Sequence, residues 1–198
     1  MDIYLIRHGQ TDYNVAHRLQ GQRDTDLNDR GRAQAREGAA FLRGRGIHIA
    51  HVYSSPLKRA VETAEIMTGI PRDRFTLDDR LKEIDFGPVE GEVWEELGDV
   101  FSDYIDDPWA NPPFDGIEPV PHLLERTKAF LQALYASPEP GPVLIATHGM
   151  TLHALLVNMD SRDRWIEPTG NCTVYHCETR EDGVTPPVQL TATGPTFG

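Results

Sequence analysis

The chain has 198 residues, 31 of them acidic and 19 basic, and a formal net charge of -12 at pH 7. This length suits one hydrophobic core, so we expect residues 1–198 to form a single domain. Nucleic acid and anionic membranes attract basic surfaces, and neither is expected as a partner of so acidic a chain. No apolar run could span a bilayer, and the predicted strand at the N-terminus leaves no room for a signal peptide. We therefore expect a cytoplasmic location.

The first predicted elements are a strand and a helix. The apolar run at 3–6 is short and rich in β-branched residues, as in a buried strand. After a polar loop, Asn28 can cap a helix over residues 29–43 because its side chain accepts from free amides of the first turn. Gly44 is suited to end that helix. These residues form one strand and helix unit.

A second unit of the same kind follows. Residues 47–53 predict a strand, again short and apolar. Ser55 suits a helix cap, and Pro56 suits the first position of the helix, where no amide partner is needed. An apolar face then continues to Gly69, which is suited to end the helix.

The pattern loosens between about residues 85 and 121, where glycines and prolines interrupt short amphipathic pieces. Because aromatic residues remain within it, we interpret this stretch as an inserted lid rather than a linker. Regular structure then resumes with a helix around 123–134, a strand at 143–146, a short helix around 152–157, and strands around 172–176 and 188–191.

Alternating strands and helices predict an α/β fold, a three-layer α/β/α sandwich with a mostly parallel central sheet. Cys172 and Cys177 are five residues apart in a predicted strand. Side chains at an odd spacing point to opposite faces of a sheet, so we expect no disulfide between them.

Two histidines follow predicted strands that are far apart in the sequence. His8 comes directly after Arg7, and His148 lies in the triplet THG at 147–149. The carboxyl ends of parallel strands open onto one ligand crevice, so these histidines can meet there. Two imidazoles beside an arginine suit an anionic group that is both held and attacked, and phosphate is the natural candidate.

Four motifs in register resemble those of the histidine phosphatase superfamily, also called phosphoglycerate mutase-like. Their order and spacing agree over most of the chain. They are RHGQT at 7–11 with Asn14 and Gln20-Gly21, SSPLKRA at 54–60, LKEIDFG at 81–87 with Glu90-Gly91, and THG at 147–149.

This resemblance implies a metal-independent phosphomonoesterase that acts through a phosphohistidine on small phosphorylated metabolites. His8 would be the nucleophile, and a neutral imidazole suits that role. Glu83 would be the general acid and then the base. Arg7, Arg59 and His148 would surround the phosphoryl oxygens, where charge stabilisation matters most.

Further substrate-binding positions implied by the resemblance are Asn14, Gln20, Gly21 and Gly149. For Asn14 and Gln20, bracing of the first loop is the alternative role. No cofactor is expected. No metal is expected either, because no ligand spacing is recognisable and the arginines would repel a cation. The partner is a small phosphate ester, and the sequence leaves the oligomeric state open.

Two other functions compete with hydrolysis. A phosphoglycerate mutase needs basic residues for a second anionic group, and this chain has neither lysine nor arginine between Lys82 and Arg126. Gln20-Gly21 also stands where the mutases resemble one another in Gly-Trp. A non-catalytic phosphate-recognition module would be attractive if a central residue were replaced, but all are present. The acidic residues of the lid are those of a solvated face over an aromatic core, or they favour substrates whose remainder is neutral, aromatic or cationic.

Overall fold

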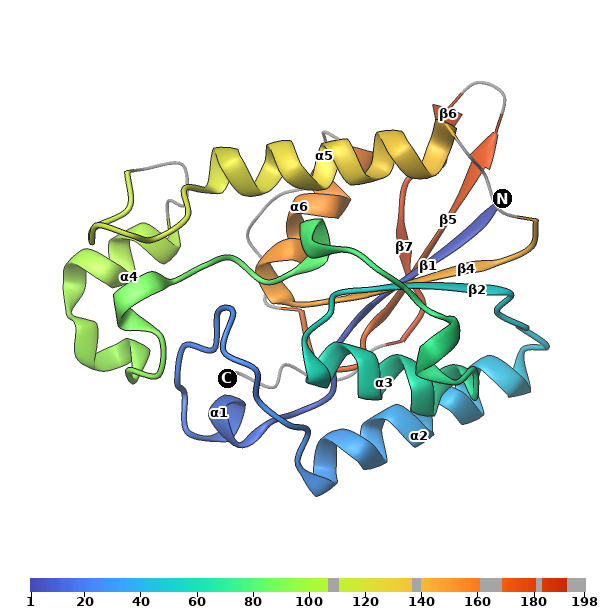
Figure 1. Ribbon diagram of the computed structural model, residues 1–198, viewed down its shortest axis with the longest axis horizontal. Coiled ribbons are helices and arrows are strands. Elements are labelled where there is room, and N and C mark those ends of the chain that lie inside the picture. The colour runs from blue at the N-terminus through green and yellow to red at the C-terminus, as the bar shows by residue number, and fades with distance from the viewer. Residues whose placement is uncertain (107–110, 137–139, 161–168, 181–182, 192–198) are drawn as a thin grey trace.

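The computed structural model describes residues 1–106, 111–136, 140–160, 169–180 and 183–191 (Figure 1). Its sheet has the order β3-β2-β4-β1-β5-β6, with β7 also beside β5. The first four strands in this order are parallel, and the pairs made by β5 are antiparallel. The strands are β1 (Asp2–Arg7), β2 (His51–Ser54), β3 (Thr76–Leu77), β4 (Val143–Thr147), β5 (Val174–Arg180), β6 (Gly183–Val184) and β7 (Val188–Gln189).

Helices cover both faces of this sheet, as Figure 1 shows, with α2 and α3 on one side and α5 and α6 on the other. The predicted three-layer sandwich is therefore confirmed, with parallel strands at its centre. The described α-helices are α1 (Asp12–Val15), α2 (Asp29–Gly44), α3 (Lys58–Thr68), α4 (Asp99–Asp106), α5 (Val120–Ala136) and α6 (Gly149–Met159). None of the helices in these described ranges combines the length and apolarity needed to cross a bilayer.

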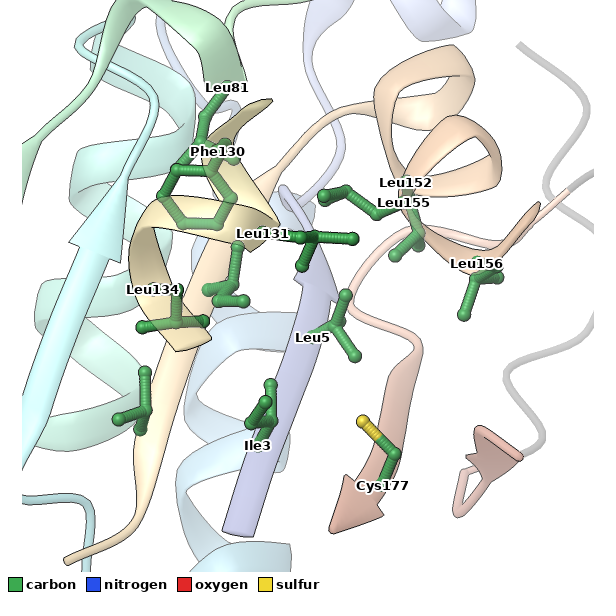
Figure 2. Close-up of a cluster of buried hydrophobic side chains, with 12 residues drawn as sticks. Ile3, Leu5, Leu81, Phe130, Leu131, Leu134, Leu152, Leu155, Leu156 and Cys177 are labelled. Atoms are coloured by element: carbon green, nitrogen blue, oxygen red, sulfur yellow. The ribbon is translucent and has the colours of Figure 1, made fainter. Parts of the chain in front are cut away.

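Alternation along β1 supplies side chains to a core on each face of the sheet. Ile3 and Leu5 pack against Phe130 of α5 and Leu155 of α6 (Figure 2). Their neighbour Ile6 faces the opposite way, into a cluster that α2 and α3 complete. Both faces of the central strands are therefore buried, each under a separate apolar cluster and a layer of helices.

The predicted lid has an apolar core of its own. It contains short 3-10 turns at Gly87–Val89 and Trp94–Leu97, followed by α4. Phe101 and Tyr104 of α4 are buried in a cluster that also contains Ala154 of α6. The described part of the insertion is thus packed onto the sandwich. Residues 107–110 of the expected range 85–121 lie outside the described residues.

Three predicted helices are present with longer bounds than the sequence indicated. The helix expected at 29–43 is α2, and Gly31 N donates to the predicted cap, Asn28 Oδ1, at 2.9 Å. The helices expected at 123–134 and 152–157 are α5 and α6. Helices α5 and α6 each extend two or three residues beyond the expected bounds at both ends.

The second predicted unit differs at its junctions. Helix α3 begins at Lys58 rather than Pro56, and Ser55 does not cap it. Ser55 Oγ instead accepts from Leu57 N at 3.3 Å, while Lys58 N donates to Asp24 Oδ1 at 2.7 Å. The strand expected at 47–53 is only His51–Ser54, because Ile47 N donates back to the last turn of α2.

The last predicted strands are also displaced. β5 begins at Val174 rather than at 172, and Cys172 lies in the preceding turn with φ 56°. Its backbone N–H donates to Arg7 O at 3.1 Å. The two cysteines are free and buried in clusters on opposite faces of the sheet, in agreement with the expected lack of a disulfide. The final strand, β7, ends at Gln189 rather than at residue 191.

A close backbone approach fixes α2 against the loop that follows β1. A methyl group on Gly31 would overlap the backbone of Gln10, whereas one on Gly44 would meet no atom within 4 Å. We predict that Gly31→Ala lowers the free energy of unfolding by about 1–3 kcal/mol, as overpacking does. Gly44→Ala should raise it by up to about 1 kcal/mol, because alanine favours the helix. Urea denaturation measures both, and equal effects of the two substitutions would contradict the packing argument.

Candidate active site

The pairing of β1 with β4 brings the two motif histidines together. Arg7 lies opposite Thr147 in the parallel register, so His8 and His148 leave their strands at the same edge. His8 N still donates to Thr147 O at 3.0 Å. The two rings are buried, with centroids 5.2 Å apart and planes tilted by 56°. The predicted meeting of the two histidines is present in the structure.

The His8 ring is held in one tautomer. Its Nδ1 lies 2.7 Å from Gly9 O, and because a carbonyl can only accept, Nδ1 carries the proton. Nε2 therefore keeps its lone pair. Burial lowers the pKa of His8 well below 6.5, and the charges of Arg59 and Arg7 add to this against the opposing bond to Gly9. At neutral pH the ring is uncharged, as a nucleophile must be.

The backbone around His8 is fixed by polar side chains from distant segments. Asn171 Nδ2 donates to His8 O at 2.9 Å, and Gly9 N donates to Thr63 Oγ1 at 3.0 Å. Sequence reasoning did not include Asn171 or Thr63 among the site residues. Each acts on the main chain across a long separation, so no local spacing indicates the contact.

Arg59 is fully buried and points from the first turn of α3 back to the sheet edge, as predicted. Its Nη2 donates to Gly21 O at 2.7 Å and its Nη1 to Arg23 O at 2.6 Å. Burial lowers the pKa of Arg59 to about 10, although the charges of Glu83 and Asp24 oppose the decrease. The guanidinium is still protonated at neutral pH and places a fixed positive charge in the site.

His148 is also held as a neutral ring. Arg59 Nε donates to His148 Nδ1 at 3.2 Å, so the ring proton is on Nε2, which donates to Ser55 Oγ at 2.8 Å. Burial lowers the pKa of His148 well below 6.5, and the nearby charge of Arg59 lowers it further. Ser55 was predicted only as a helix cap; its contact with His148 is a site role that the sequence did not indicate.

Glu83 is 8% exposed and lies against the first turn of α6. Its Oε1 accepts from Ile84 N at 3.0 Å, from Thr151 N at 3.1 Å and from Thr151 Oγ1 at 3.1 Å. Its Oε2 accepts only from Met150 N, at 3.2 Å, among the described contacts. Oε2 is therefore the oxygen with more capacity to exchange a proton.

Arg7 and Gly149 lie beside this carboxylate. A methyl group on Gly149 would lie 3.6 Å from Glu83 Oε2 and 3.7 Å from Arg7 Cζ, in ordinary contact with both. The Arg7 guanidinium donates to Thr169 O through Nη1. Burial lowers the pKa of Arg7, and the charge of Glu83 opposes that decrease. The predicted catalytic residues thus lie at one edge of the sheet.

The predicted substrate-binding residues of the first loop make bracing contacts. Asn14 Oδ1 accepts from Thr11 N at 3.0 Å, and Gln20 Oε1 accepts from Thr11 Oγ1 at 2.9 Å and Thr25 Oγ1 at 2.7 Å. Gly21 has φ 50° and turns its carbonyl toward Arg59. These contacts are those of the alternative role, and direct binding of substrate by Asn14, Gln20 and Gly21 stays a prediction.

A possible metal-ligand group lies elsewhere. Among the described residues, only Asp2, His176 and Glu178 bring three metal-capable atoms within 4.8 Å of one another. They lie on β1 and β5, and Asp2 begins the strand whose opposite end leads to His8. The sequence did not indicate this group, because two strands far apart in the chain supply it.

A comparison with protein families identifies the chain. A model of the histidine phosphatase superfamily, branch 1, matches residues 3–188. The chain belongs to this superfamily. The match includes all four predicted motifs and confirms the resemblance on which the assigned roles depend.

Individual relatives carry both phosphatase and mutase names. A putative phosphoserine phosphatase of Hydrogenobacter thermophilus is 34% identical over 158 residues, which cover 78% of this chain and 76% of that protein. A probable phosphoglycerate mutase of Proteus mirabilis is 34% identical over 164 residues, covering 79% and 73%. A mycobacterial glucosyl-3-phosphoglycerate phosphatase structure superposes with a TM-score of 0.77 at 30% identity, covering 89% of this chain and 92% of that one. The family and these phosphatases show that this histidine phosphatase is an enzyme.

The lowered pKa values of the buried histidines predict loss of stability in acid. Below pH about 6.5 the unfolded chain takes up protons at His8 and His148 that the folded chain does not. Each histidine should then lower the free energy of unfolding by about 1.4 kcal/mol per pH unit.

Urea denaturation between pH 7 and pH 5 measures this slope. His8→Gln should reduce the slope by about one proton relative to the native chain. His48→Gln, which changes an exposed side chain, is the control and should retain the native slope. A native slope in His8→Gln would show that the folded protein binds the proton as readily as the unfolded chain.

Proposed function

We propose that the chain hydrolyses small phosphate monoesters through a phosphohistidine at His8. The observation that carries the proposal is a neutral His8 Nε2 in a buried site with the fixed charges of Arg7 and Arg59. A phosphate monoester would supply negative charge to balance these two guanidinium groups. The proposed enzyme is cytoplasmic, where small phosphorylated metabolites are made, and its acidic charge disfavours nucleic acid and anionic membrane as partners.

In the first step, His8 Nε2 attacks phosphorus and the ester P–O bond breaks. The proton on Nδ1 stays in its hydrogen bond to Gly9 O, so the phosphorylated ring keeps the orientation of the free one. Arg7 and Arg59 stabilise the charge that spreads over the phosphoryl oxygens. Their positive charge takes the role that a cation has in other phosphoryl-transfer enzymes, so we propose that turnover needs no metal.

Glu83 handles the proton in both steps. The departing oxygen takes a proton from the Glu83 carboxyl as the P–O bond breaks. Water then attacks phosphorus, gives a proton to the Glu83 carboxylate, and the P–N bond breaks to release inorganic phosphate. Oε2 is the oxygen that we assign to this exchange, because Oε1 is occupied by three hydrogen bonds.

His148 holds Arg59 through its Nδ1, and a phosphoryl oxygen would compete with Ser55 for its Nε2–H. We propose that His148 both orients the guanidinium and binds the phosphoryl group. Gly149, beside Glu83 and Arg7, leaves room for the substrate there.

Hydrolysis is favoured over mutase activity by charge. The insertion has no lysine or arginine before Arg126, and Asp99, Asp103 and Asp115 are exposed on it. A second anionic group would meet repulsion there, while a neutral or cationic remainder would not. Release of inorganic phosphate from a monoester with a neutral or cationic remainder, faster than from 3-phosphoglycerate, supports a phosphatase. Conversion of 3-phosphoglycerate to 2-phosphoglycerate supports a mutase, and turnover of no ester in a broad panel supports a recognition module.

Trapping of the covalent intermediate tests the nucleophile. We predict that brief mixing with a ³²P-labelled phosphomonoester, followed by denaturation in alkali, leaves label on the native protein that acid removes. His8→Ala should trap none, because the attacking nitrogen is absent. Chelators should leave turnover unchanged. Label on His8→Ala at the native level, or a strict requirement for Mg²⁺, would overturn the proposal.

The leaving group tests Glu83. An alkyl phosphate needs a proton on its departing oxygen, whereas a nitrophenolate leaves without one. We predict that Glu83→Gln slows single-turnover cleavage of an alkyl phosphate by about a hundredfold to ten-thousandfold, and of p-nitrophenyl phosphate far less. Asp85→Asn is the matched control and should affect both esters little. Equal losses for the two esters in Glu83→Gln would assign that residue a structural role.

A further inference from the structure

A nearly buried ion pair joins the end of the insertion to α5. Arg126 Nε lies 2.8 Å from Glu118 Oε1, and Arg126 Nη2 lies 3.0 Å from Glu118 Oε2. The side chains are 13% and 8% exposed. Two parallel hydrogen bonds between a guanidinium and a carboxylate fix both groups in direction as well as distance. Glu118 is therefore paired and nearly buried, whereas Asp99, Asp103 and Asp115 of the insertion are exposed.

The remaining donors and acceptors of the pair hold the segment that carries Glu83. Arg126 Nη1 donates to Arg80 O at 2.6 Å, and its Nη2 donates to Glu83 O at 3.1 Å. Glu118 Oε2 accepts from Asp85 N at 3.2 Å, and Glu118 N donates to Asp85 O at 2.7 Å. The pair thus contacts the main chain before Glu83, at Glu83 and after it.

This segment is irregular, although the side chains of Ile84 and Phe86 are buried in the apolar cluster of the insertion. Residues 82–86 belong to neither helix nor strand. Other hydrogen bonds to its carbonyls are donated by Thr151 Oγ1 to Lys82 O at 2.7 Å, by Gln22 Nε2 to Glu83 O at 3.4 Å and by Val89 N to Phe86 O at 3.3 Å. Of the two described hydrogen bonds to Glu83 O, that from Arg126 is the shorter, so Arg126 helps to fix the main chain from which the Glu83 side chain leaves.

The pair is electrically balanced. Burial alone would raise the pKa of Glu118, but the hydrogen bonds and charge of Arg126 outweigh burial and lower it, with further help from Asp85 N–H and His122. The carboxylate stays ionised and neutralises Arg126. The guanidinium is thereby committed to holding the main chain instead of acting as a further cation for phosphate.

We propose that the Glu118–Arg126 pair is a positioning device for proton transfer by Glu83. This inference rests on the proposed role of Glu83 as general acid and base. Neither member of the pair is assigned a contact with substrate. By fixing the main chain on both sides of Glu83, the pair holds its carboxyl against the first turn of α6, where Oε2 can reach the departing oxygen.

Leaving-group selectivity tests this proposal. In single turnovers, Arg126→Lys and Glu118→Gln should slow an alkyl phosphate by roughly tenfold or more, a part of what general acid catalysis provides. They should slow p-nitrophenyl phosphate by less than about threefold, since phosphoryl transfer from that ester needs no acid. KM should change little. The retained aryl phosphate rate also shows that each variant is folded.

Arg32→Lys is the matched control. Arg32 Nε donates to Glu62 Oε1 at 2.7 Å in another arginine–glutamate pair, between α2 and α3, which does not contact the Glu83 segment. Its substitution should not alter the ratio of alkyl to aryl rates. A ratio lowered as much in Arg32→Lys as in Arg126→Lys would overturn the proposal, and so would equal slowing of both esters in Arg126→Lys.

A double-mutant cycle separates this inference from the proposed function. If Arg126 acts through Glu83, then adding Arg126→Lys to Glu83→Gln should lower the alkyl to aryl ratio by less than about twofold further, because coupled residues are not additive. A full additional loss would show that Arg126 acts independently and would overturn the inference alone. If Glu83→Gln by itself leaves the ratio of alkyl to aryl rates unchanged, both the proposed role of Glu83 and this inference are overturned.

Discussion

The parallel register between β1 and β4 is the constraint on which the site depends. It places Arg7 opposite Thr147, so that the next residues, His8 and His148, emerge side by side from strands separated by most of the chain. Both strands are buried on both faces, and a shift of one residue would exchange the side chains of the two apolar clusters. The same hydrophobic packing that stabilises the sheet therefore fixes the distance between the two imidazoles.

The site is preorganised by charges that are fixed before any ligand arrives. A fully buried guanidinium such as that of Arg59 costs free energy unless its donors are paired, and here backbone carbonyls and His148 pair them. Burial and the two arginines keep both histidines neutral. A bound phosphate would find donors and positive charge already in place, which is how such sites stabilise a transition state with little reorganisation.

The inserted segment contributes to the same site from the outside. Its aromatic cluster includes Ala154 of α6, the helix whose first turn holds the Glu83 carboxylate. Its last residues supply Glu118, which meets Arg126 on α5. The insertion and the sandwich are thus joined through the short irregular segment that carries Glu83. Variation in the insertion can change the surroundings of a leaving group while the β1 and β4 edge stays the same.

The sequence by itself determined the layered fold, the capped helix at Asn28 and the meeting of His8 with His148, because hydrophobic period and strand-end position are local signals. The resemblance carried by the four motifs added Glu83 and Arg59 to the predicted site residues. Only the tertiary structure decided the bonds that orient these residues. Such hydrogen bonds join Asn171 to His8 O, His148 to Ser55, and Arg126 to Glu83 O. Each joins positions 43 to 163 residues apart. Most involve a main-chain carbonyl, which every residue has, so no residue type or spacing in the sequence could indicate which one is bound.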